Sequence, residues 1–115
     1  MTEIKAVVFP DAESWLRENF WDMVTDTMCL VCIKVIDKEG FKVEYRDLEE
    51  PDDEPVIRDM NDHVVALQKL ADQIGKTLFV GGIKSPTELL DPGNWDAEVV
   101  DAYRQLVLYD EVVYG

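Results

Sequence analysis

One stretch of the chain constrains the fold more than any other, because it combines two strand patterns with a turn between them. Residues 28–36 are mostly apolar and rich in β-branched side chains, which favours a strand. Residues 37–40, Asp-Lys-Glu-Gly, are typical of a tight turn, in which Gly40 is able to take a positive φ. Residues 41–46 then alternate, so that one side of the strand is buried and the other faces solvent. The expected core-facing residues are Phe41, Val43 and Tyr45, and the expected solvent-facing residues are Lys42, Glu44 and Arg46.

Amphipathic helices are expected on both sides of this hairpin. Residues 12–26 carry apolar side chains at helical spacing, and Asp11 is a favourable N-cap for them. Residues 55–74 repeat this spacing, with Asp53 as the expected N-cap. Gly75 is the expected stop, because glycine ends helices readily in the left-handed conformation.

The remaining elements are shorter. The sequence predicts a buried strand over residues 5–9 and another over residues 76–83. Residues 85–88, Ser-Pro-Thr-Glu, match a capping box with proline at the first helical position, which predicts a short helix. The last helix is expected to begin near Trp95, with Asn94 as its cap.

These elements give the order β-α-β-β-α-β followed by a C-terminal helix. This is the order of a ferredoxin-like α+β domain, so we expect that fold or a related antiparallel or mixed sheet, in one domain over residues 1–115. One feature conflicts with this layout. The strand at residues 28–36 would lie at the edge of the sheet, yet it is apolar on both faces, as central strands are. Either the C-terminal segment covers it, or the strand order is different.

Composition limits the classes of partner. The 115 residues are 47% hydrophobic, which suits a single globular domain, and their net charge is −14. A field of this sign repels phosphate backbones, so direct binding to nucleic acid is disfavoured. The longest apolar run, residues 28–33, is far shorter than the ~20 residues that span a membrane. The first residues lack the pattern of a signal peptide, so we expect a cytoplasmic protein without a membrane partner.

The acidic charge is most concentrated between the hairpin and the helix that follows it. The acids there are Glu49, Glu50, Asp52, Asp53 and Glu54, and prolines interrupt the run instead of the glycine that a calcium loop requires. The leading hypothesis is a non-enzymatic binding or inhibitor protein that docks a basic protein surface. A sharper version is a mimic of nucleic-acid charge, by analogy with small acidic inhibitors encoded by phages, whose partner is a nucleic-acid-binding protein.

Aromatic residues suggest where such a partner would be anchored. Trp21, Tyr109 and Tyr114 are candidates for exposed interface residues, since tryptophan and tyrosine often dominate interface energetics. The alternative is that these rings pack in or beside the core.

A second hypothesis is a regulatory domain that binds a small ligand. Gly81, Gly82, Lys84 and Ser85 connect an expected strand to an expected helix, where free amides and a lysine can hold an anion. The segment lacks both the P-loop and the dinucleotide-binding patterns. A simple strand exit with Ser85 as a helix cap explains the same residues.

A third hypothesis is a small enzyme that uses Asp59, Asp62 and His63. An Asp–His pair one helical turn apart can tune a general base or hold a metal. The alternative is a solvated histidine beside the apolar stripe of its helix. No nucleophile or metal motif accompanies the histidine, so we assign no catalytic residue, metal or cofactor.

Cys29 and Cys32 form a CxxC pattern inside the apolar run. Redox chemistry would need the first cysteine at a helix N-terminus, and zinc would need a second pair of ligands. Residues three apart in a strand point to opposite faces. We therefore expect buried, reduced thiols that are not linked to each other.

Overall fold

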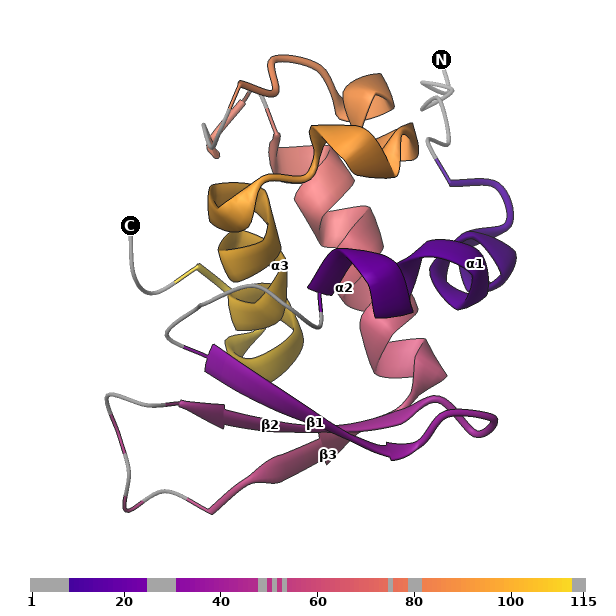
Figure 1. Ribbon diagram of the computed structural model, residues 1–115. Helices are drawn as coiled ribbons and strands as arrows, with labels where there is room; N and C mark the ends of the chain where they lie inside the picture. Colours follow the sequence, from indigo (N-terminus) through magenta and orange to yellow (C-terminus); the bar gives the residue numbers. More distant parts are fainter. Residues whose placement is uncertain are drawn as a thin grey trace, which may run out of the picture.

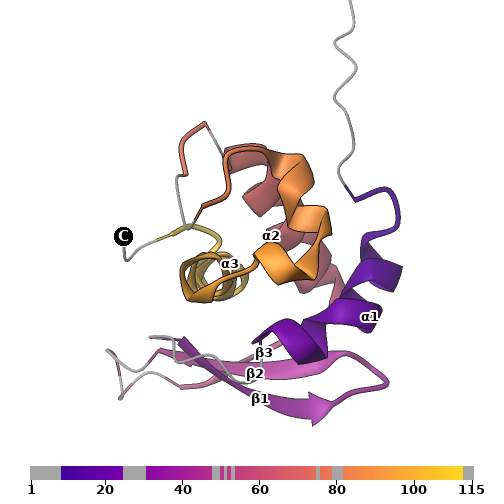
Figure 2. The same ribbon diagram turned by 45° about the horizontal axis from the view of Figure 1, so that its top comes forward.

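Helices lie on one face of a small antiparallel sheet. The computed structural model describes residues 9–24, 31–47, 50, 52, 54–74, 76–78 and 82–112, with the backbone alone for residues 22–24 and 32. Within these ranges the helices are stacked above the three strands, and no described element lies against the opposite face of the sheet (Figure 1, Figure 2). The mixed α+β class is confirmed, whereas the ferredoxin-like order is not, because the described residues form three strands.

The elements occur in the order α1, β1, β2, β3, α2, η1, η2, α3, where η1 and η2 are short 3₁₀ helices. Their bounds are α1 Ala12–Val24, β1 Val31–Asp37, β2 Lys42–Asp47, β3 Val56–Arg58, α2 Met60–Gln73, η1 Pro86–Leu90, η2 Pro92–Asn94 and α3 Ala97–Tyr109.

The predicted hairpin is confirmed. β1 and β2 pair antiparallel, and Ile33 lies opposite Tyr45 and Lys34 opposite Glu44. In β2 the residues on the helix side are buried and those on the other side are exposed or half-buried, as the alternation predicts. The buried residues of this strand are Val43, Tyr45 and Asp47.

The turn of the hairpin differs in one detail from the prediction. The residue with positive φ is Phe41, at 52°, and not Gly40. Phe41 is fully buried against Phe20 and Trp21, so core packing holds a backbone conformation that a bulky residue otherwise avoids. Gly40 is needed for a different reason: a Cβ there would lie 2.6 Å from a carboxylate oxygen of Asp37.

α1 begins where the sequence predicts, because the Asp11 carboxylate accepts a hydrogen bond from the Ser14 amide at 3.2 Å. The helix predicted over residues 55–74 is wrong in its first turn. Residues 56–58 instead pair with β2 as the strand β3, and α2 begins at Met60. The β-branched residues there complete a sheet ladder, which outweighs their place in the helical pattern. The predicted cap, Asp53, lies outside the described residues.

The C-terminal part of the chain holds two further corrections. Residues 76–78 form a turn with one isolated bridge, Ile74 to Leu78, and not the start of a strand. α3 is capped by Asp96, whose carboxylate accepts from the Val99 amide at 3.0 Å, and not by Asn94. Asn94 instead ends the tight turn η2. The short helix expected after Ser85 is present, as the 3₁₀ helix η1. The predicted strand at residues 5–9 falls almost wholly outside the described residues, as do Gly75 and residues 79–81.

The position of β1 resolves the conflict in the sequence pattern. The sheet order is β1-β2-β3, so β1 is an edge strand. α3 covers its first half, where the Arg104 guanidinium donates to the Val31 carbonyl at 2.9 Å. Its second half is uncovered, and Val35 and Ile36 are 39% and 46% exposed. Strand β1 is therefore apolar on both faces without being central.

Candidate functional site

The acidic linker joins β2 to β3. Its described acids, Glu50, Asp52 and Glu54, are all exposed, and none forms an ion pair with a described residue. Glu49 and Asp53 lie outside the described residues. The linker is fixed at its start, because the Glu50 amide donates to the Asp47 carbonyl at 3.3 Å. Among the described residues, no group of three or more possible metal ligands comes together.

A contact between distant segments extends this acidic region. The Tyr109 hydroxyl, at the end of α3, donates a hydrogen bond to the buried carboxylate of Asp47. The exposed acids that follow Tyr109, Asp110 and Glu111, are therefore held near the start of the linker. Asp110 forms an ion pair with Lys69, whereas Glu111 has no ion pair with a described residue. No local pattern indicates this contact, since 62 positions separate the two bonded side chains.

The aromatic residues predicted to anchor a partner make contacts within the molecule, as far as the structure describes them. Trp21 is half-buried, and its ring packs edge-on against Phe20 at 5.0 Å and tilted against Phe41 at 4.8 Å. The Lys38 ammonium lies 5.5 Å from the centre of the same ring. Tyr109 is half-buried and bonded as described above. Tyr114 lies outside the described residues. Trp21 and Tyr109 thus offer only part of their surface to a partner.

His63 is buried, so the expectation of a solvated histidine is wrong. Its exposed fraction is 0%, and the rings of Phe20 and Phe41 lie 5.1 and 4.8 Å from the imidazole. The Tyr45 hydroxyl donates to Nε2 at 2.7 Å, and Nδ1 donates to the Asp59 carbonyl at 2.5 Å. This pairing requires the neutral imidazole, and burial lowers the pKa of His63 to about 4. Burial likewise raises the pKa of the Tyr45 hydroxyl well above its ordinary value.

The neighbouring carboxylates accept hydrogen bonds from backbone amides at the start of α2 and not from the imidazole. The Asp59 side chain accepts from the Asp62 amide at 3.1 Å, and the Asp62 side chain accepts from the Asp59 amide at 3.0 Å. This is a reciprocal capping box at the start of α2. The hydrogen bond from the Asp62 amide is the main reason that the pKa of Asp59 is lowered. Both imidazole nitrogens are occupied by protein groups, so the arrangement does not present a base to solvent and gives no support to the enzyme hypothesis.

The predicted anion cradle is filled from within the chain. The amides of Lys84 and Ser85 both donate to the Glu88 carboxylate, at 2.6 and 2.9 Å. These two hydrogen bonds lower the pKa of Glu88. Gly82 is exposed with open space around it, and Gly81 lies outside the described residues. An anionic ligand would have to displace Glu88 from the amides.

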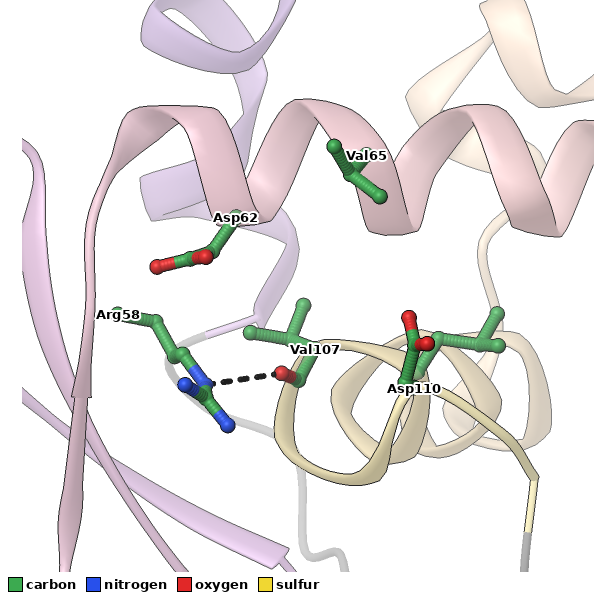
Figure 3. A pocket seen from close by; sticks show the side chains of 6 residues that line it. Arg58, Asp62, Val65, Val107 and Asp110 are labelled. Carbon is green, nitrogen blue, oxygen red and sulfur yellow. Dashed lines mark hydrogen bonds between the residues drawn. The ribbon is translucent and has the colours of Figure 1, made fainter.

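A shallow hollow of about 220 Å³ lies between the start of α2 and the end of α3 (Figure 3). The Arg58 guanidinium crosses it and donates to the carbonyls of Val107 and Leu108 at 3.1 and 3.0 Å. A cation is favourable there, because these carbonyls form the negative end of α3. The hollow is smaller than most ligand pockets, which measure roughly 300–1,000 Å³. Its lining residues are Arg58, Asp62, Val65, Leu106, Val107 and Asp110.

The thiol prediction falls outside what the structure describes, since Cys29 and the side chain of Cys32 are not among the described parts. Of the helices that the structure describes, none combines the length and the apolar character that crossing a membrane demands. No protein-family model, curated protein or solved structure matches the chain, so its function is argued from its own residues.

Proposed function

We propose that this protein is a non-enzymatic acidic binding protein that docks a positively charged surface of a partner protein. The observation that carries the proposal is the exposure of the linker acids Glu50, Asp52 and Glu54, whose charges no described cation neutralises. Glu111 adds to the same region through the contact between Tyr109 and Asp47. A net charge of −14 surrounds this region with a field of the same sign.

Such a field acts mainly on the rate of association. Complementary charges steer a partner toward the docking geometry and raise the association rate more than they raise the affinity. At physiological salt the field decays over about 8 Å, so only a partner that docks closely feels it. The sharper form of the proposal is an inhibitor that mimics nucleic-acid charge and occupies the groove of a nucleic-acid-binding protein. Its proposed compartment is the cytoplasm.

The test compares two variants of equal net charge. The linker variant carries Glu50→Gln, Asp52→Asn and Glu54→Gln, and the matched control carries Glu13→Gln, Glu18→Gln and Glu39→Gln, three exposed acids outside the acidic region. A partner is captured from a cell extract with the immobilised protein and identified by mass spectrometry, and its association rate is then measured at several NaCl concentrations. We expect the rate to fall with salt for the unmodified protein, and to be slowed more by the linker variant than by the control.

Two results would contradict the proposal. A rate that does not change with salt would show that the acidic linker only aids solubility. An equal slowing by both variants would show that net charge, and not the linker, attracts the partner. Competition by duplex DNA separates the sharper form from the general one, because a groove that binds nucleic acid releases the protein when DNA is added.

The ferredoxin-like arrangement also stays a proposal. Its first strand falls on residues 5–9, of which the structure describes Phe9 alone. Phe9 is buried and its ring packs against Trp15 of α1 at 4.9 Å, which fits a segment that ends in the core.

A further inference from the structure

The face of the sheet turned away from the helices carries a charge opposite to that of the protein. Strand register places Lys34, Glu44 and Ile57 side by side across β1, β2 and β3. Lys42 and Arg46 lie on the same side of β2, two residues before and after Glu44. We call these five residues the outer sheet face. It is the side of the sheet on which no described element lies (Figure 2).

The charges of the outer sheet face are available to a partner. It holds three cations and one carboxylate, and a second carboxylate, Asp37, lies opposite Lys42 and accepts a hydrogen bond from the Gly40 amide. Cations therefore still outnumber acids there, although the whole chain has a net charge of −14. The side chains of Lys34, Lys42 and Arg46 are exposed, and none forms a hydrogen bond or an ion pair with any residue in the described part of the chain. The acids of the protein are therefore found elsewhere, mainly on the helices, turns and linker.

The same face exposes large apolar side chains. Ile57 is 56% exposed in β3, directly opposite Glu44, and is the most exposed large hydrophobic residue among those described. Ile36 is 46% exposed where the register of β1 shifts, beside the turn of the hairpin. Neither isoleucine alone marks a site, because single exposed apolar residues are common on protein surfaces. Together with the unengaged cations, they give the face apolar as well as charged groups to offer a partner.

We propose that the outer sheet face docks an acidic, amphipathic segment of a partner protein. Charge complementarity selects an acidic ligand, and the isoleucines select one with apolar side chains beside its acids. β1 and β2 have seven and six residues and β3 has three, so at about 3.3 Å per residue and 4.8 Å between strands the face covers roughly 250 Å². This is well below the ~800 Å² that each partner buries in a standard interface. One helix or strand is therefore the fitting occupant.

This proposal goes beyond the proposed function, which concerns the acidic linker and a basic partner. A long polyanion is a poorer fit for the outer sheet face. Nucleic acid and anionic membrane extend past a face of this size and meet the acids around it, and the net charge of −14 repels them. A short acidic segment stays within the local positive field.

The test uses a designed 18-residue fluorescent peptide with leucines at helical spacing and glutamates beside them. Its binding is followed by fluorescence anisotropy, and its site is mapped from shifts of backbone amide resonances. We expect binding to shift the amides of the outer sheet face. The variant Lys34→Gln/Arg46→Gln, and separately Ile57→Thr, should weaken binding at least tenfold. The matched control, Lys76→Gln/Lys84→Gln, removes two exposed cations elsewhere and should leave binding within about twofold.

Several outcomes would overturn the proposal. If the control variant weakens peptide binding as much as Lys34→Gln/Arg46→Gln does, net charge alone explains the effect. If a peptide of scrambled sequence binds as tightly as the designed one, the isoleucines do not select apolar side chains. Tighter binding of single-stranded DNA or of anionic vesicles than of the peptide would assign the face to another class of ligand. The charge variant alters only exposed side chains, so it can be tested even if Ile57→Thr unfolds. The linker variant should retain peptide binding, which separates failure here from failure of the proposed function.

Discussion

Acid should lower the free energy of unfolding through His63. The size of the effect depends on how far burial lowers the pKa of the imidazole. The pKa of His63 is about 4 in the folded protein and about 6.5 when the chain unfolds. Between these values the unfolded chain binds a proton that the folded protein does not. Stability therefore falls as the pH falls from about 6.5 to about 4, and this contribution stops changing below that range. With 1.36 kcal/mol for each pKa unit, the total loss is about 3 kcal/mol.

The assay is urea unfolding followed by tryptophan fluorescence, at steps from pH 7.5 to pH 3.5, for the unmodified protein and for His63→Gln. The pKa values of Asp59 and Glu88 are lowered by hydrogen bonds from backbone amides, so these two groups also make the stability fall in acid. Their effects largely cancel in the difference between the two proteins. At pH 7 we expect the unmodified protein to be the more stable, and the difference to shrink by about 3 kcal/mol as the pH falls to 4.

A second measurement needs no substitution. His63 is the only histidine of the chain, so its imidazole resonances can be followed by NMR without ambiguity. They should keep the shifts of the neutral ring well below pH 6. A midpoint near 6.5, or a stability difference that does not change with pH, would refute a buried neutral imidazole bonded to Tyr45.

Two further predictions rest on individual contacts, and a third rests on the strand pattern around the two cysteines. Asp59→Ala removes one half of the capping box and should lower the free energy of unfolding by about 1 kcal/mol, measured in urea. Arg58→Gln removes the guanidinium from the carbonyls at the end of α3 and should cost about 1–2 kcal/mol in the same assay, more than a substitution of the exposed Lys76. Cys29 and Cys32 should react slowly with a thiol reagent in the native protein and quickly in urea; rapid native labelling would contradict the expectation of buried thiols.

The parts of the fold that the sequence predicts are those with a local cause. The hairpin follows from the alternation of residues 41–46 and the turn before it, and the start of α1 follows from the carboxylate of Asp11. Both signals act within a few residues of their own position. β3 was missed because residues 56–58 become a strand only through pairing with β2, which no local pattern encodes.

The burial of His63 can be predicted from the sequence, but its hydrogen-bond partner cannot. Met60, His63, Leu67 and Leu70 are buried, and they follow one another at intervals of three or four residues. The helical period therefore places His63 on the buried stripe of α2, and not beside that stripe in solvent. What the period does not show is the Tyr45 hydroxyl that makes the burial tolerable, because it comes from a separate strand.

The two proposed surfaces follow one another in the chain and carry charges of opposite sign. Each surface therefore changes the electrostatic field of the other. β2 contributes Lys42, Glu44 and Arg46 to the outer sheet face and then leads directly into the acidic linker. The linker acids lie close enough in the chain to weaken the positive field of that face, and the cations of the face weaken the field of the linker. Neutralising the linker should therefore slow the basic partner and tighten the acidic peptide, while neutralising Lys34 and Arg46 should do the reverse. These opposite signs follow from the placement of the charges and cannot arise from a general change in stability, which would weaken both ligands together.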